Sequence, residues 1–349
     1  MNIHCDFVGG NIEVISISGS DIYLKNQIRD SGIDWFYWAF CVEGAENKEL
    51  CFHMDPNRLG YWGPAVSYDL ENWHWLDSVD GDSFTYKFGK DEKKVYFAHN
   101  MLYHPKRFFA LAEELSLDVT ELCKSRKGRT VPASIMGEGN KNIILTARHH
   151  ACEATGSYVL EGVLRELSEN PIPDTKIFCV PFVDYDGVVD GDQGKARKPH
   201  DHNRDYSPEE SIYPETAAIK AYANEYGCHY GFDFHSPWHK SGENDNIFIV
   251  RNSIEKQDRA DRFSKIFENQ ITAGSMNYKA ENDHPPMTGW NQPSSNFGFT
   301  MNHRTECEIA HSLESAYFGT AENKVSEGRL IELGRCYARA IKEYIAGKE

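Results

Sequence analysis

The chain has 349 residues, which is long enough for two domains or for one large domain with an appendage. It carries 53 acidic against 37 basic residues, a formal net charge of −16, and this excess repels phosphate backbones, so we expect no nucleic-acid partner. No run of eighteen apolar residues occurs and the first residues lack the regions of a signal peptide, so we expect no membrane association and a cytoplasmic location.

The nine cysteines stand singly rather than in CxxC pairs. This pattern indicates neither a disulfide framework nor a cysteine zinc finger, because both need paired spacings. We therefore expect reduced thiols.

Residues 1–103 are expected to form a β-rich domain. Short aromatic and β-branched runs occur at 35–40, 84–88 and 94–98, with turn residues between them. This spacing predicts a β-sandwich. The tryptophans and tyrosines of these runs could form a carbohydrate-binding surface, but aromatic residues at strand spacing are more often core residues.

From residue 104 onward the sequence alternates between strand and helix patterns. Strands are expected at 142–147, 176–183 and 230–234. Helices are expected at 108–121, 158–167, 214–226, 253–270 and 325–346. This order predicts a second domain, residues 104–349, in which helices cover an α/β sheet.

The first chemical signal lies at residues 146–153, where a buried strand ends and a helix begins. In open α/β sheets, functional sites collect at this edge. His150 and Glu153 are separated by two residues, so a turn leading into a helix can aim both side chains at one point, as zinc requires. His149 is the competing ligand. An HxxE pair alone is equally compatible with a polar strand end and a capped helix.

A second signal is His235, which ends another apolar strand 82 positions beyond Glu153. A catalytic zinc site needs three protein ligands and one open position, and two strand ends can supply these ligands. Alone, His235 could be a half-buried histidine with satisfied hydrogen bonds. Its place between Asp233 and Ser236 on a strand tip favours a metal ligand.

A long polar loop, residues 184–205, lies between these two signals and contains Lys195, Arg197 and Arg204. These cations could bind an anion through paired hydrogen bonds. The alternative is a solvated turn with ordinary surface charge.

Several ordered motifs together resemble the M14 zinc carboxypeptidases. They are HxxE at 150–153, Asp-Gly at 186–187, Asp-x-Asn-Arg at 201–204 and Asp-x-His-Ser at 233–236. The leader, with its Trp-Gly-Pro at 62–64 and Tyr-Phe-Ala-His at 96–99, resembles the amino-terminal domain of the cytosolic carboxypeptidase branch. The resemblance covers nearly the whole chain. It implies a mixed-sheet carboxypeptidase domain with helices on both faces, preceded by a β-sandwich-like domain.

This resemblance also implies a metal centre. His150, Glu153 and His235 would hold one zinc ion per chain. Asp201 would lie behind a ligand imidazole and orient it, which sets the tautomer and basicity of the ring.

The polar loop would bind the substrate. Asn203 and Arg204 match the pair that binds the terminal carboxylate of the substrate in this family. Arg197 is the candidate for stabilising the oxyanion. The loop departs from the usual Gly-Asn-x-Arg form of the family, so Lys195 is an alternative to Arg197.

The general base of the family lies on a late strand and is followed by an apolar residue. This chain offers Glu306 and Glu308, the latter followed by Ile309. Residues two positions apart share one face of a strand, so the pattern alone leaves both open. Glu308 is the better match to the family.

The implied activity is that of a zinc-dependent metallocarboxypeptidase, which hydrolyses the C-terminal peptide or isopeptide bond of a substrate with a free terminal carboxylate. One alternative is a zinc-dependent acyl-amino-acid hydrolase or amidase. Another is a non-catalytic peptide-binding module. A serine hydrolase is disfavoured because the sequence contains no Gly-x-Ser-x-Gly elbow. The pattern leaves the side-chain preference open.

Overall fold

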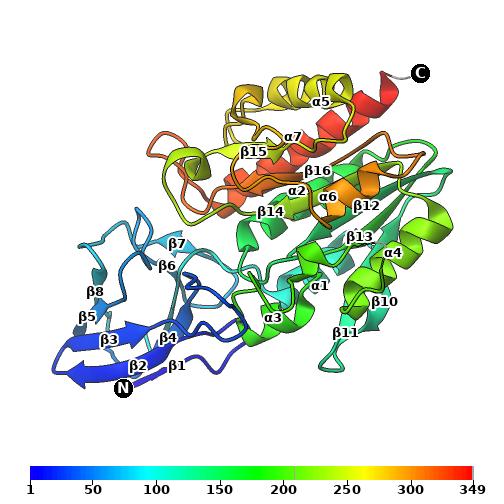
Figure 1. Ribbon diagram of the computed structural model, residues 1–349. Coiled ribbons are helices and arrows are strands. Elements are labelled where there is room, and N and C mark those ends of the chain that lie inside the picture. Colours follow the sequence, from blue (N-terminus) through cyan, green and yellow to red (C-terminus); the bar gives the residue numbers. More distant parts are fainter. Residues whose placement is uncertain (208, 348–349) are drawn as a thin grey trace.

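The computed structural model describes residues 1–207 and 209–347. Its amino-terminal part is built from two packed β-sheets (Figure 1). The first sheet contains, in spatial order, β1 (Asn2–His4), β4 (Ala39–Glu43), β9 (Lys94–Ala98), β6 (Ala65–Ser67) and β7 (His74–Trp75). The second contains β2 (Glu13–Ser18), β3 (Asp21–Lys25), β5 (Glu49–His53) and β8 (Ser83–Lys87).

Aromatic side chains join these two sheets. Phe40 and Phe97 of the first sheet pack against Phe52 of the second, with ring centroids 5.5 Å apart in each pair. Every second residue of a strand points to the same face, so alternate residues of β4 and β9 form the inner layer of the sandwich. The expected strands at 84–88 and 94–98 are β8 and β9. The run at 35–40 enters strand geometry only at Ala39.

The second part of the chain contains a mixed seven-stranded sheet with helices on both faces. Its strands, in spatial order, are β10 (Asp118–Lys124), β11 (Thr130–Met136), β13 (Thr175–Val180), β12 (Lys141–Ala147), β14 (Tyr230–His235), β16 (Ile309–Ser315) and β15 (Ile247–Val250). The central strands β13, β12, β14 and β16 are parallel to one another, and the pairs at both edges are antiparallel.

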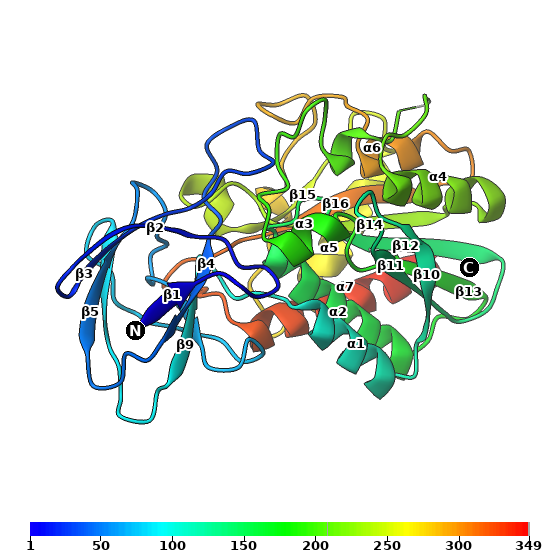
Figure 2. The same cartoon turned by 90° about the horizontal axis from the view of Figure 1, so that it is seen from below.

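The helices divide between the two faces of this sheet (Figure 2). They are α1 (Pro105–Glu114), α2 (Ala154–Glu169), α3 (Tyr185–Asp190), α4 (Pro214–Tyr226), α5 (Gln257–Gln270), α6 (Phe297–Asn302) and α7 (Glu327–Ala346), with short 3₁₀ turns at His202–Arg204, Gly242–Asp245 and Ala280–Asn282. On β12, Ile143 and Leu145 pack under α2 and α7, whereas Ile144 packs under α4 and α6. None of the described helices is long and apolar enough to span a membrane.

The helix expected at 108–121 is wrong in its second half. Helix α1 ends at Glu114, and Asp118–Lys124 forms β10 instead. Ser116 adopts a left-handed conformation (φ 53°), which turns the chain out of the helix. The following segment contains β-branched residues and pairs with β11, so strand pairing overrides the helical spacing.

One hydrophobic cluster contains residues of both parts of the chain. Trp35 and Phe36 of the amino-terminal part are buried in the cluster that also contains α2 and α7. Two indole groups tie the parts together: Trp62 Nε1 donates to the carbonyl of Phe318 (2.9 Å), and Trp75 Nε1 to that of Val325 (2.8 Å). The amino-terminal part therefore packs directly against the second part of the chain.

Candidate active site and metal centre

The carboxyl ends of β12 and β14 bring three possible metal ligands together. After β12, a turn carries His150, and Glu153 stands at the start of α2. His235 is the last residue of β14. Arg148 enters the turn with φ 59°, and its Nε donates to the carbonyl of Ala151 (2.8 Å), which holds the turn in shape.

The ligand atoms of these three residues face one another. His150 Nδ1 lies 2.8 Å from Glu153 Oε1, and His235 Nδ1 lies 2.7 Å from Glu153 Oε2. All three side chains are buried, and their ligand atoms lie within 4.8 Å of one another. Two imidazole nitrogens and a carboxylate are a donor set that suits zinc.

Further polar residues lie near the Nε2 atoms of the two imidazole rings. Asp233 Oδ2 lies 2.6 Å and Asn203 Nδ2 lies 3.2 Å from His235 Nε2. Asp201 Oδ1 lies 3.6 Å from His150 Nε2, beyond hydrogen-bonding distance. Burial alone would raise the pKa of Asp233, but the adjacent His149 and His235 bring it below its ordinary value. Each Nε2 therefore faces a carboxylate, and each Nδ1 faces the centre of the group.

The competing candidate ligand, His149, makes hydrogen bonds with other residues. Its Nδ1 lies 2.9 Å from Asp233 Oδ1, and its Nε2 lies 2.7 Å from the hydroxyl of Tyr206. His149, Asp233 and His235 are also close enough to form a metal group. However, the Nδ1 atoms of His150 and His235 both face Glu153, whereas the ring nitrogens of His149 face Asp233 and Tyr206, so the group of His150, Glu153 and His235 is the better candidate.

A cavity of about 320 Å³ opens beside this group. Its lining includes His150, His235, Lys195, Asn203, Arg204 and Glu314. The indole rings of Trp238 and Trp290, each about half exposed, also lie on this lining. The cavity therefore gives a substrate access to the candidate metal ligands.

Arg197, the predicted oxyanion residue, does not line this cavity. Its guanidinium pairs with Asp30 (2.6 Å), Asp184 (2.8 Å) and Asp192 (3.2 Å). Burial would lower the pKa of Arg197, but Asp184 and Asp30 raise it above its ordinary value. Such a surrounded guanidinium stabilises the loop and is not available to a substrate.

Lys195, the alternative, lies at the site. Its Nζ is 3.0 Å from His150 Nδ1 and 3.2 Å from Glu153 Oε1. Burial would lower the pKa of Lys195, but Glu153 raises it above its ordinary value, so the side chain carries a positive charge. Lys195 therefore places a cation beside the candidate metal ligands.

The predicted carboxylate-binding pair lines the cavity. Arg204 Nη1 donates to the carbonyl of Asn203 (2.9 Å), and the side chain is otherwise exposed. The side chain of Asn203 is more constrained, because its Oδ1 accepts the N–H of Phe297 (3.1 Å) while its Nδ2 faces His235. Arg204 is thus the freer of the two to contact a substrate.

The structure places the predicted base, Glu308, far from the metal ligands. Glu308 precedes the amino end of β16, and its carboxylate pairs with Arg259. The other candidate, Glu306, pairs with Arg304 (2.7 Å). In the parallel pairing of β14 with β16, the partner of His235 is Glu314, six residues after Glu308 and roughly 20 Å further along the strand.

Glu314 is a functional candidate that sequence reasoning missed. It is buried on the lining of the cavity, and burial raises its pKa to about 7, with Glu153 adding to the rise and His235 opposing it. A signal was present, because Glu314 is a lone carboxylate near the carboxyl end of a buried strand, where sites of α/β sheets collect. The family match to Glu308 misplaced the end of that strand.

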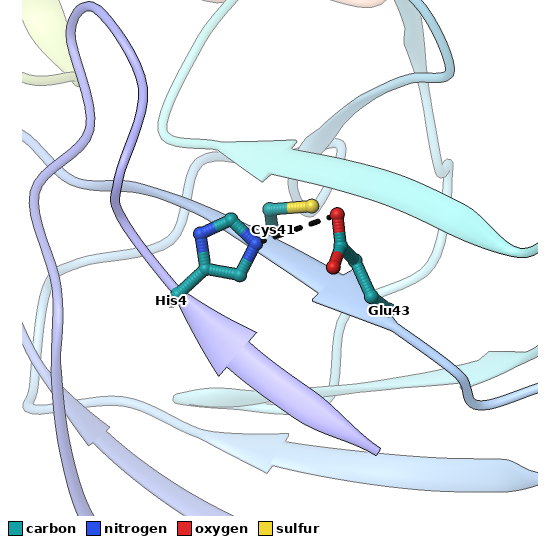
Figure 3. A group of neighbouring side chains, drawn as sticks. All are labelled: His4, Cys41 and Glu43. Carbon is teal, nitrogen blue, oxygen red and sulfur yellow. Dashed lines mark ion pairs between the residues drawn. The ribbon is translucent and has the colours of Figure 1, made fainter.

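A separate group in the amino-terminal part contains His4, Cys41 and Glu43 (Figure 3). Glu43 already pairs with Lys94 Nζ (2.9 Å), and His4 Nε2 lies 3.6 Å from Glu43 Oε1. The Nδ1 of His4 accepts the N–H of Asp6 (3.2 Å), so a neutral ring carries its proton on Nε2 and offers no lone pair there. This arrangement is an ion-pair cluster and does not suit a metal.

Comparison with known proteins identifies the relatives of this chain. Residues 3–99 match the family model of the cytosolic carboxypeptidase N-terminal domain. The amino-terminal part of the chain is thus similar to that of the cytosolic carboxypeptidases. It is 29% identical over 169 residues to cytosolic carboxypeptidase 2 of Xenopus tropicalis, which covers 40% of this chain and 17% of that protein.

Solved structures show that the fold is that of metallocarboxypeptidases. A metallo-carboxypeptidase from Burkholderia cenocepacia matches with a TM-score of 0.82 at 19% identity, over 100% of this chain and 99% of that one. A metallo-carboxypeptidase from Pseudomonas aeruginosa, in complex with (2-guanidinoethylmercapto)succinic acid, matches with a TM-score of 0.80 at 20% identity, over the full length of both chains.

Proposed function

We propose that this chain is a zinc-dependent metallocarboxypeptidase that removes the terminal residue of a peptide or isopeptide with a free C-terminal carboxylate. The observation that carries this proposal is the cavity that is lined by His150 and His235 of the candidate metal group, by the buried carboxylate of Glu314 and by the exposed guanidinium of Arg204. A binding module without activity would not need a buried carboxylate of raised pKa beside three metal ligands.

The donor set fits one zinc ion per chain. Two histidine nitrogens and a carboxylate would hold the metal, and the adjacent cavity leaves a position open for a substrate or water. Zinc, when bound there, would act as a Lewis acid that polarises a carbonyl and makes water more acidic.

Glu314 takes the role of general base in place of Glu308. Its carboxylate would accept a proton from the attacking water and deliver it to the leaving amine. Burial raises the pKa of Glu314 to about 7, and a cation held by His150 and His235 favours its ionised form. Glu314 would then be ready to accept a proton at neutral pH.

The two cations of the cavity would bind the substrate. Lys195 lies beside the metal ligands, where its ammonium group would stabilise the negative charge that develops on the scissile carbonyl oxygen. Arg204 would bind the terminal carboxylate through two parallel hydrogen bonds. Asn203 positions His235 and would support Arg204 through its carbonyl.

This role of Arg204 is tested with a peptide and its C-terminal amide. An amide cannot accept both hydrogen bonds and leaves the guanidinium charge unpaired, so we expect the amide to react at least ~10-fold more slowly. Arg204→Ala should lower the rate on the free acid and reduce this difference. Arg204→Lys should have an effect between those of the wild type and Arg204→Ala, because it keeps the charge without the planar guanidinium group.

Two results would contradict the assignment. Equal rates on the acid and the amide, or cleavage inside a terminally blocked peptide, would exclude a carboxypeptidase even if zinc is bound. Rapid hydrolysis of acylated amino acids with no turnover of longer peptides would assign the alternative acyl-amino-acid hydrolase activity.

A further inference from the structure

The inner wall of the cavity contains two small side chains. Ser312 lies two residues before Glu314 on β16, so both point to the same face of the sheet. Val250 of β15 is the direct antiparallel partner of Ser312, and residues that oppose each other in this way share a face. Both side chains line the cavity, one step below the proposed base.

The cavity has few charged groups beyond those already assigned. Among the described residues on its lining, the charged side chains outside the metal ligands are Lys195, Arg204 and Glu314. Arg251 follows Val250 in the chain, but its guanidinium is paired with Glu255 (2.5 Å) and Asp261 (3.0 Å). Beyond the proposed catalytic and carboxylate-binding residues, the wall thus offers no charged partner to a side chain of the substrate.

The wall does offer hydrogen-bonding groups. Asn291 is buried, and its Nδ2 donates to the carbonyls of Arg251 (2.7 Å) and Pro285 (3.1 Å), which uses both amide hydrogens. Its Oδ1 is left as an acceptor. In the part of the chain that the structure describes, the hydroxyl of Ser312 has no hydrogen-bond partner and can donate or accept.

We propose that this cavity selects a terminal residue with an uncharged amide side chain, glutamine or asparagine. The inference rests on the proposed carboxypeptidase function and names its substrate class. An amide would donate to Asn291 Oδ1 and accept from Ser312, so both wall groups gain partners. A carboxylate would face the Asn291 oxygen without a cation, and an aliphatic or thioether side chain would leave both wall groups without partners.

The test uses four peptides that differ only in an unbranched terminal residue: Gln, Glu, Met or Lys. Gln and Glu have nearly the same shape, so their comparison isolates charge, whereas Gln and Met differ mainly in hydrogen bonding. We expect kcat/KM for the Gln peptide to exceed each of the other values by at least ~10-fold.

Substitutions of Val250 provide a matched pair. Val250→Lys places an ammonium group in the wall, so it should reverse the preference in favour of the Glu peptide. Val250→Met has a similar length without the charge and should not produce this reversal. Ser312→Ala removes one hydrogen-bonding group, so it should reduce the advantage of Gln over Met by roughly 5-fold or more.

Binding to the zinc-loaded Glu314→Gln variant, measured by calorimetry, provides a second readout that does not depend on turnover. The Gln peptide should bind at least ~5-fold more tightly than the Glu peptide. Cleavage or binding of the Glu, Met or Lys peptide as good as that of Gln would overturn the proposed selectivity and leave the peptidase assignment intact. Failure of the zinc-loaded wild type to cleave any of the four peptides would overturn both.

Discussion

At the residue scale, the position of a carboxylate along one strand decides its role. Glu308 and Glu314 belong to the same segment, yet one pairs with Arg259 before the strand begins and the other faces the cavity at its carboxyl end. The two glutamates therefore form a natural pair of test and control.

Glu314→Gln should lower kcat by a factor on the order of 100 or more with zinc retained, because the amide keeps the shape of the side chain but cannot accept the proton. Glu308→Gln should change kcat by less than about 3-fold, since its ion pair with Arg259 is partly exposed and lies far from the candidate metal ligands. Steady-state kinetics and elemental analysis check both variants. A larger loss of activity in Glu308→Gln than in Glu314→Gln would return the role to Glu308.

Metal content gives a second prediction at this scale. The purified protein should contain about one zinc per chain, and His150→Ala, Glu153→Ala or His235→Ala should each lose it. His239→Ala is the control, because His239 is buried outside the group and makes no contact with its ligand atoms in the described structure. Retention of zinc by His235→Ala together with its loss from His239→Ala would show that the ligand assignment is wrong.

At the element scale, the packing of α2 against α7 supports the turn that carries His150 and Glu153, since Glu153 stands at the start of α2. The two helices cross at glycines. A Cβ at Gly162 would lie 1.9 Å from the carbonyl oxygen of Ile331, and one at Gly334 would lie 1.9 Å from that of Val159. The backbones of α2 and α7 therefore lie so close together at these two glycines that no residue with a Cβ atom fits there without moving the helices.

Gly162→Val should accordingly lower the free energy of unfolding by about 2–3 kcal/mol or more, because the helices must separate. Gly328→Ala is the control: it lies in the first turn of α7 with open space around it, and alanine should be neutral or stabilise the helix by up to about 1 kcal/mol. Denaturant unfolding measures both changes. Equal stability of the Gly162→Val variant and the wild type would contradict the close crossing.

At the scale of the whole molecule, the core extends across both parts of the chain. Trp35 and Phe36 lie in the same cluster as Tyr158 of α2 and Tyr337 of α7. Trp35 also lines the cavity, so a residue of the amino-terminal part forms one wall of the candidate site.

A shared core predicts that the two parts unfold together. Calorimetry should show one transition, with equal calorimetric and van't Hoff enthalpies. Removal of zinc with a chelator should lower the midpoint temperature of this single transition, because zinc binds only the folded chain. Two resolved transitions, of which only one responds to the chelator, would show that the parts are independent.

Sequence pattern by itself determined the α/β class, the β-rich leader and most of the strands and helices of the second part, because periodicity and turn residues are local properties. Strand ends and a helix start pointed to Glu153, His235 and either His149 or His150, and the resemblance to the M14 carboxypeptidases selected His150 as the third candidate ligand. The sequence pattern did not predict where α1 ends, because the pairing of β10 with β11 overrides the local helical spacing.

Only the tertiary structure decided which charged residues reach the cavity. Whether Glu308 or Glu314 approaches the ligands depends on the register between β14 and β16, two strands that are far apart in the sequence. Lys195 and Arg197 are two positions apart on one loop, yet Arg197 pairs with Asp30 of the amino-terminal part as well as with Asp184 and Asp192, whereas Lys195 lies beside His150. The pairing with Asp30 and the register between β14 and β16 leave no local pattern, so the sequence names the candidate ligands but not which charged residues lie beside them.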